Sequence, residues 1–125
     1  MSQKIKIFAG SVEAEALLND TATAQKIWDA LPLDTRANIW GDEVYFAILV
    51  KAPLEKTAQE VVEIGDLGYW PPGNAFCIFF GPTPVSKGSE VRAASAVNVI
   101  GRVLGDAKVF KKVPSGAKVR IERLP

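Results

Sequence analysis

The fold is decided by residues 65–84, which read GDLGYWPPGNAFCIFFGPTP. Four glycines and four prolines bracket one strongly apolar run, residues 75–80. This run is too short for a typical helix and is rich in aromatic side chains, so it predicts a buried strand. The glycine- and proline-rich flanks predict rigid loops that carry the aromatic pair Tyr69 and Trp70. The stretch identifies a fold class more readily than a function.

The rest of the sequence predicts a mainly β protein. Apolar and β-branched residues form short runs separated by glycine-containing turns. Together with residues 75–80, the strands expected from this pattern are residues 4–8, 12–18, 33–39, 44–50, 61–64, 96–104 and 117–124. Gly101 lies inside one of these runs and indicates a bulge. Residues 69–73 are expected to be a loop or the end of a strand, residues 82–95 mostly loop, and residues 106–113 a short helix or another strand.

One clear helix is expected between Thr21 and Pro32. Asn19, Asp20 and Thr21 are residue types that accept hydrogen bonds from the free N–H groups at a helix start. Apolar side chains then recur at helical spacing on one face, at Ala24, Ile27, Trp28 and Leu31. Proline cannot continue a helix, so Pro32 ends it.

Length and composition restrict the class of protein. The 125 residues, 48% of them hydrophobic, are expected to form one domain (residues 1–125) with its own core. The net charge of +1 comes from interspersed charges, without the concentrated basic face that nucleic-acid binding needs. No apolar run is long enough to span a membrane and the N-terminus has no apolar leader, so we expect a cytoplasmic protein. One cysteine excludes an intrachain disulfide.

The chain contains no histidine, which limits its chemistry. The commonest general base and the commonest metal ligand are both missing, as is every histidine-dependent triad. The acidic candidates for a metal site, Asp20, Asp42 and Asp66, lie beside turns or a helix start, where aspartate has its own backbone hydrogen-bonding role. Cys77 lies among apolar neighbours, which raise a thiol pKa and make it inert. We therefore expect no cofactor and no metal.

Two groups of residues are candidates for binding. Tyr69 and Trp70 offer large rigid surfaces next to two prolines, which limit the entropy lost on binding. The alternative is that both rings pack in the core and close the end of the fold.

The second group is Trp40, Glu43, Tyr45 and Phe46. Strand alternation places Glu43 and Tyr45 on one face and Phe46 on the other. A carboxylate beside a phenol can bind an amine or hold a proton in transfer. The alternative is an ordinary glutamate and tyrosine that face solvent.

Four segments of the chain resemble a family of small bacterial and archaeal cyclophilin-like proteins of unassigned role. They are residues 18–24 (LNDTATA), 40–46 (WGDEVYF), 65–84 and 94–102 (ASAVNVIGR). The resemblance implies a closed eight-stranded cyclophilin-like β-barrel with one or two helices.

The same resemblance bears on activity. Cyclophilin prolyl isomerases use an arginine in a Phe-His-Arg context and a Gln-Phe-Phe segment, and neither motif occurs here. Arg36 is the only arginine between the helix and the Gly65 loop, so it is the one candidate for the catalytic arginine.

The preferred hypothesis is a barrel that binds a small molecule or a proline-containing peptide without isomerase activity. The expected binding face comprises Glu43, Tyr45, Tyr69, Trp70 and Phe80, together with Arg36. Two alternatives remain open: a divergent prolyl isomerase that uses Arg36, and an interaction module that forms a homo-oligomer.

Overall fold

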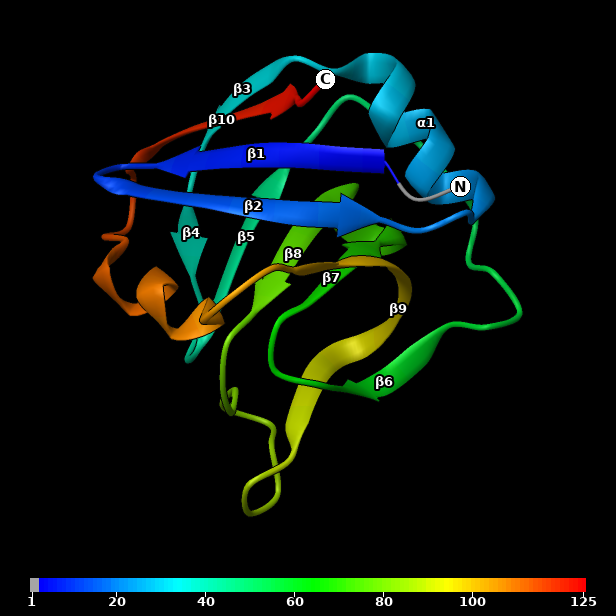
Figure 1. Ribbon diagram of the computed structural model, residues 1–125. Helices are drawn as coiled ribbons and strands as arrows, with labels where there is room; N and C mark the ends of the chain where they lie inside the picture. The colour runs from blue at the N-terminus through cyan, green and yellow to red at the C-terminus, as the bar shows by residue number, and fades with distance from the viewer. Residues whose placement is uncertain (1–2) are drawn as a thin grey trace.

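The computed structural model describes residues 3–125, which form ten strands, one α-helix and two 3₁₀ helices (Figure 1). The strands are β1 (Gln3–Ala9), β2 (Val12–Leu18), β3 (Leu33–Arg36), β4 (Asn38–Ile39), β5 (Glu43–Ala47), β6 (Gln59–Val62), β7 (Asp66–Trp70), β8 (Ala75–Phe79), β9 (Val91–Val103) and β10 (Lys118–Arg123). The helices are α1 (Ala22–Ala30), η1 (Pro71–Gly73) and η2 (Ala107–Lys112). Within this range, no helix has the length and apolar character needed to cross a membrane.

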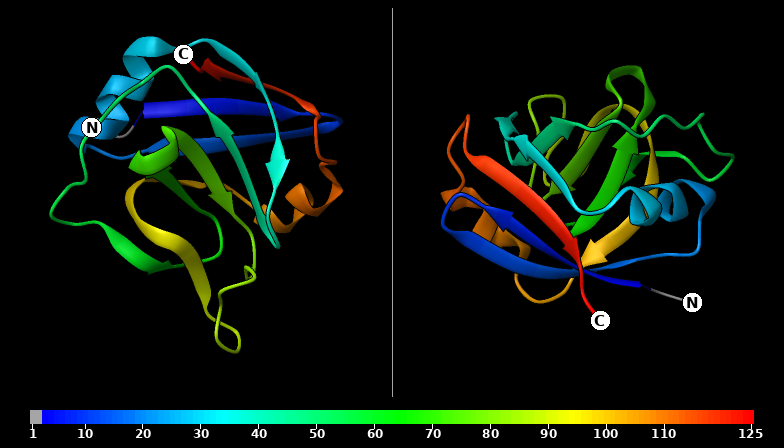
Figure 2. Two further views of the ribbon diagram at one scale, coloured as in Figure 1. Left: turned by 180° about the vertical axis from the view of Figure 1, so that it is seen from behind. Right: turned by 90° about the horizontal axis from the view of Figure 1, so that it is seen from above.

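The strands form one antiparallel sheet that curls round on itself (Figure 2). Its order is β3-β10-β1-β2-β9-β7-β8-β5-β4, and β6 pairs with β9 outside this path. The two edge strands, β3 and β4, are consecutive in the chain and are separated only by Ala37. The backbone of Ala37 still bonds to the segment before β10, since its N–H donates to Ala117 (2.8 Å) and its carbonyl accepts from Gly116 (2.8 Å). One residue later, Asn38 pairs with Tyr45 of β5.

The expectation of a closed eight-stranded barrel therefore needs correction. Within residues 3–125 there are ten strands, and no ladder of hydrogen bonds joins the two edges of the sheet. Residues 33–39, expected to be one strand, are a bent segment that leaves β10 and joins β5. The covalent chain, and not a strand pair, links the two edges.

The helix α1 covers one end of the sheet, as the sequence pattern predicts. Thr21 is its N-cap and accepts a hydrogen bond from the N–H of Ala24 (3.2 Å). Ala24 and Ile27 are fully buried. Buried Asn98 of β9 ties the helix to the long loop after β5, because its side-chain amide donates to Thr23 Oγ1 (3.0 Å) and to the carbonyl oxygen of Pro53 (3.0 Å).

Strand β8 separates two apolar layers, which explains why residues 75–80 contain no polar side chain. Phe76, Ile78 and Phe80 belong to the interior cluster of the curled sheet. Ala75, Cys77 and Phe79 belong to a second cluster, which also contains side chains of β6 and of the first half of β9. A strand covered on both faces is expected to be continuously apolar. The predicted buried strand is confirmed, and its two faces point to different environments.

Strand β7, strand β9 and the segment after β9 can be compared with the secondary structure expected from the sequence. Residues 66–70 are a strand, β7, so Tyr69 and Trp70 form the end of a strand, the second of the two alternatives for that segment. Strand β9 begins at Val91, inside the region expected to be mostly loop, because Val91 pairs with Val62 of β6. The bulge expected at Gly101 is present, since the pairing with β7 shifts between Gly101 and Val99. Residues 107–112 form a 3₁₀ helix, which decides between the two alternatives for that segment.

Candidate functional site

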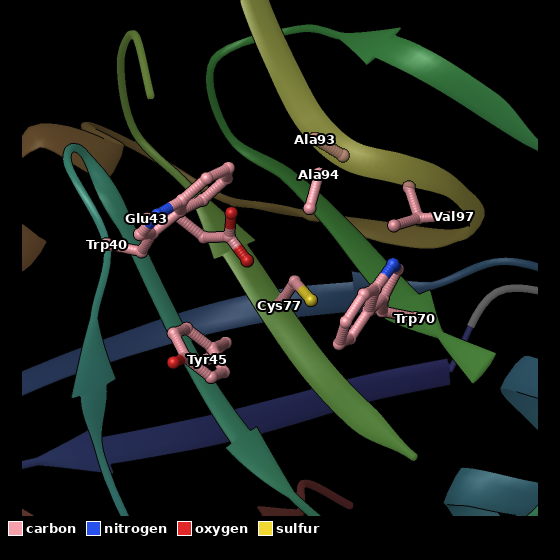
Figure 3. A pocket seen from close by; sticks show the side chains of 8 residues that line it. All are labelled: Trp40, Glu43, Tyr45, Trp70, Cys77, Ala93, Ala94 and Val97. Atoms are coloured by element: carbon pink, nitrogen blue, oxygen red, sulfur yellow. The ribbon is translucent and has the colours of Figure 1, made fainter. Parts of the chain in front are cut away.

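A cavity of about 290 Å³ lies on the face of β5, β8 and β7 that looks away from the interior cluster (Figure 3). The first half of β9 passes over this face (Figure 1). The residues that line the cavity are Trp40, Glu43, Tyr45, Trp70, Cys77, Ala93, Ala94 and Val97.

Strand pairing brings the floor of the cavity together. Tyr45 on β5 lies directly opposite Cys77 on β8, and Cys77 lies opposite Gly68 on β7. Gly68 has no side chain to fill the space: a Cβ there would lie 3.0 Å from Val97 and 3.1 Å from Phe79. The missing side chain therefore lets β9 approach the sheet closely.

A tight hairpin positions Trp40 and Glu43. Their backbones exchange two hydrogen bonds, with N–O distances of 3.0 and 3.2 Å, around the two-residue turn of Gly41 and Asp42. Gly41 has φ of +58°, as the first residue of a type II′ turn requires. The turn is fixed to the chain after β8, because the N–H of Asp42 donates to the carbonyl oxygen of Pro82 (3.0 Å). Directly opposed residues in such a pair carry their side chains on the same face of the hairpin.

Trp70 forms the opposite wall and is held in one orientation. Its indole Nε1 donates a hydrogen bond to Oγ of Ser95 on β9 (2.7 Å). Gly73 of η1 lies against the ring, where a Cβ would approach two indole carbons to 2.9 Å. The proline- and glycine-rich stretch therefore leaves the space that the Trp70 ring occupies.

Glu43 is the chemically distinctive group of the cavity. Its side chain is only 5% exposed, and burial raises its pKa from 4.5 to about 7. Hydrogen bonding to the neighbouring Cys77 thiol partly offsets this rise in the pKa. Figure 3 shows the carboxyl oxygens directed into the space between Trp40, Cys77 and Ala94.

Cys77 is buried, and its thiol is expected to be unreactive. Burial, and then the negative charge and hydrogen bonding of Glu43, hold the pKa of its thiol well above the usual value. The thiol also lies 3.8 Å from the carbonyl oxygen of Ala75. A thiol held protonated is a poor nucleophile.

The structure brings together three of the six residues expected to form the binding face. Glu43, Tyr45 and Trp70 line the cavity. Glu43 is buried, so it is not the solvent-facing glutamate of the alternative interpretation. Its neighbour Phe46 points to the interior and stacks on Phe76, with ring centroids 5.2 Å apart.

The other three residues lie elsewhere. Tyr69 is fully buried on the interior side, and its hydroxyl donates to the carbonyl oxygen of Val50 (2.7 Å). Phe80 is 3% exposed and also belongs to the interior cluster. Strand alternation explains both positions. It puts Tyr69 on the face of β7 opposite to Trp70, and it puts Phe80 on the face opposite to Cys77. Arg36 is exposed on β3, where its guanidinium donates to the carbonyl oxygen of Gly116 (3.0 Å), and it does not line the cavity.

Five lining residues were not part of the expected binding face: Trp40, Cys77, Ala93, Ala94 and Val97. Trp40 belongs to the second candidate group named from the sequence, and the Gly41-Asp42 turn places it opposite Glu43. Cys77 has the opposite parity to Phe80 along the strand, so the same alternation that excludes Phe80 includes Cys77. The residues of β9 carry no local signal, because only the pairing of strands brings them to the site.

The described residues contain no group of three or more side chains suited to hold a metal ion. Of the three aspartates named from the sequence, Asp42 and Asp66 lie at turns, and the Asp66 carboxylate accepts a hydrogen bond from the N–H of Glu63 (2.9 Å). The cavity itself offers one carboxyl group, one thiol and three aromatic rings.

Comparison with known proteins shows which family the chain resembles. The family model described as Cyclophilin-like matches residues 3–122. The chain is similar to a hypothetical protein from Archaeoglobus fulgidus, whose solution structure has a TM-score of 0.83 and 42% sequence identity. That match covers 98% of this chain and 95% of the archaeal one. No curated protein matches the sequence.

Proposed function

Because the chain belongs to the cyclophilin-like family, as the sequence resemblance predicted, we propose a function from its own cavity. The protein binds a small molecule or a short peptide segment between Trp40, Glu43 and Trp70, and it does not isomerise prolyl bonds. The observation that carries this proposal is the aromatic-walled cavity with one buried carboxyl group directed into it.

The shape of the site supports binding. Ligand sites are concave and mostly apolar, with a few placed polar groups, and they range upward from about 300 Å³. The volume of about 290 Å³ lies at the small end of that range. The hairpin turn fixes Trp40 and the Ser95 hydroxyl fixes Trp70. Walls that are already ordered lose little entropy when a ligand binds.

The charges of the site argue against prolyl isomerisation. In the family mechanism an arginine polarises the prolyl amide, and stabilisation of this kind needs a donor next to the reacting group. No arginine or lysine is among the residues that line the cavity, and its charged residue is the acidic Glu43. Arg36 donates instead to the backbone of Gly116.

Binding is tested by screening a fragment library against the protein by NMR. Fragments are expected to shift the indole N–H resonances of Trp40 and Trp70 and to leave that of Trp28, on α1, unchanged. Ala94→Phe fills the cavity from an exposed position whose methyl group points into it, so it should abolish these shifts. Ser89→Phe, in the exposed loop before β9, is the matched control. If no fragment shifts either cavity tryptophan, the proposed function is wrong.

Isomerase activity is tested separately with a protease-coupled peptide assay. We expect no rate above the uncatalysed reaction. A catalysed rate that Arg36→Ala removes would contradict the proposal and support a divergent prolyl isomerase.

A further inference from the structure

The cavity has the chemistry of a cation receptor, and we propose that it binds an organic ammonium ion. This inference rests on the proposed binding function and names its ligand class. The ammonium group would lie against the rings of Trp40, Tyr45 and Trp70 and face the carboxylate of Glu43.

The first argument is that Glu43 has no cationic partner within residues 3–125. Other acidic side chains of the described chain pair with lysine or arginine at the surface, at Glu13, Glu15, Asp34, Glu60, Glu90 and Glu122. Glu43 is more deeply buried than any of these, yet no lysine or arginine among the described residues forms an ion pair with its carboxyl group. A buried carboxylate without a partner is costly, and a cation supplied by a ligand would remove that cost.

The second argument is the set of aromatic walls around this carboxyl group. Trp40 stands next to Glu43 across the hairpin, Tyr45 follows on the same face of β5, and Trp70 forms the far wall (Figure 3). The faces of tryptophan and tyrosine rings attract cations, and quaternary ammonium groups are bound in aromatic cages of this kind. The three rings and the carboxyl group line one cavity, so each can attract a cation bound there.

The third argument concerns which cation fits. Metal ions such as Ca²⁺ and Mg²⁺ need several oxygen ligands, whereas the side chains that line this cavity include one carboxyl group. Ala93, Ala94 and Val97 provide an apolar wall that suits the carbon substituents of an alkylammonium ion. The small volume favours a free small molecule over a bulky side chain presented by a protein.

Binding should be linked to protonation of Glu43. The titratable side chains that face it are Cys77 on β8 and Tyr45 on its own strand, and the lining residues of β7 and β9 do not titrate. Nearby Arg92 is engaged by Glu60 and Glu90. Since the pKa of the Glu43 carboxyl is about 7, part of the empty protein is protonated near neutrality. A cation binds the ionised form, so its affinity should rise as the pH increases toward about 8.

The test compares a cation with its neutral carbon isostere. Choline and 3,3-dimethylbutan-1-ol have the same shape and differ in charge. We expect choline to bind the wild-type protein at least about tenfold more tightly at about pH 8, measured by calorimetry and by the tryptophan indole resonances. Glu43→Gln should remove this preference and its pH dependence while the neutral isostere binds as before. Glu13→Gln, at an exposed ion pair with Lys6, is the control and should bind choline like the wild type.

The outcomes separate this inference from the proposed function. Equal binding of choline and the isostere, or choline binding that survives Glu43→Gln, would overturn the ammonium site and leave the binding function standing. If fragments bind in the cavity but neither choline nor benzyltrimethylammonium does, the ammonium inference is again wrong. A capped peptide containing trimethyllysine forms a further arm. Binding of choline but not of this peptide assigns the ammonium group to a free small molecule, and tighter binding of the peptide assigns it to a protein side chain.

Discussion

Trp40 and Glu43 face each other across a two-residue turn and exchange two backbone hydrogen bonds of 3.0 and 3.2 Å. The pairing places a large aromatic ring next to a buried carboxyl group at the entrance to β5. Local backbone geometry therefore fixes the relative positions of the two groups on which the site depends most.

The ionisation of Glu43 should destabilise the folded protein. Its folded pKa of about 7 lies above the unfolded value of 4.5, so the folded state binds the proton more tightly. The contribution of Glu43 to the free energy of unfolding is then greatest below pH 4.5 and falls as the pH rises to about 7. Glu43→Gln should gain about 2–3 kcal/mol relative to wild type between about pH 5 and about pH 8. Urea denaturation at both pH values measures this change, with Glu13→Gln as the control. A difference between Glu43→Gln and wild type that is constant with pH would contradict it.

Gly41 should be required for stability for two reasons: its positive φ and the close approach of Pro84 and Thr83 to its Cα. A Cβ there would lie 2.7 Å from Pro84 and 2.9 Å from the backbone of Thr83. Gly88 has a similar φ, +66° against +58°, but open space around it. Gly88→Ala is therefore expected to cost about 1 kcal/mol, and Gly41→Ala about 2–4 kcal/mol. Equal losses in denaturant unfolding would show that the contacts of the hairpin turn carry no stability.

The Ser95 hydroxyl should hold the indole of Trp70 in place. Ser95→Ala removes the acceptor of the 2.7 Å bond from Nε1 and is expected to cost about 1 kcal/mol. Hydrogen exchange at the Trp70 indole should accelerate, because the N–H loses its partner. Ser89→Ala, in the exposed loop, should change neither quantity. An unaltered exchange rate in Ser95→Ala would mean that ring packing alone orients Trp70.

Asn98 should be among the most sensitive polar positions. It is 1% exposed, its amide donates to Thr23 and to the backbone of Pro53, and its oxygen accepts from the N–H of Glu55. Asn98→Asp keeps the shape but replaces two donors by acceptors, so we expect a loss of about 3 kcal/mol or more. Exposed Asn38→Asp is the control and should change stability little. Thermal unfolding distinguishes them, and similar midpoints would contradict the role of Asn98.

Much of the fold could be predicted from local patterns. The strands β1 and β2, the helix capped by Thr21 and the buried strand β8 all follow from side-chain periodicity and turn residues, and the structure confirms them. The start of β7 and residues 91–95 of β9 are not predicted as strand, because neither alternates clearly. Gly68 interrupts β7, and small alanines occupy β9 where it crosses the sheet. Their strand conformation comes from partners far along the chain.

Some residues of the site could also be predicted from local patterns, and others could not. Alternation correctly put Glu43 and Tyr45 on one face and Phe46 on the other. The same rule separates Tyr69 from Trp70 only if the two residues end a strand, and the proline- and glycine-rich sequence leaves a loop equally open. Arg36 was chosen for its position between two segments of the sequence, which carries no information on the direction of its side chain.

A mainly β fold, the absence of histidine chemistry and the parity of side chains along β5 and β8 can be predicted from the chain alone, because they depend on composition and on residues a few positions apart. The burial of Glu43, and its lack of a cationic partner among the described residues, follow from the packing of strands that are far apart in the chain. Residues of β9, some fifty positions later in the chain, line the same cavity as Glu43, and Gly68 leaves room for β9 to approach the sheet. Burial raises the pKa of Glu43, and this burial depends on segments that are distant in the sequence, so no local pattern predicts it.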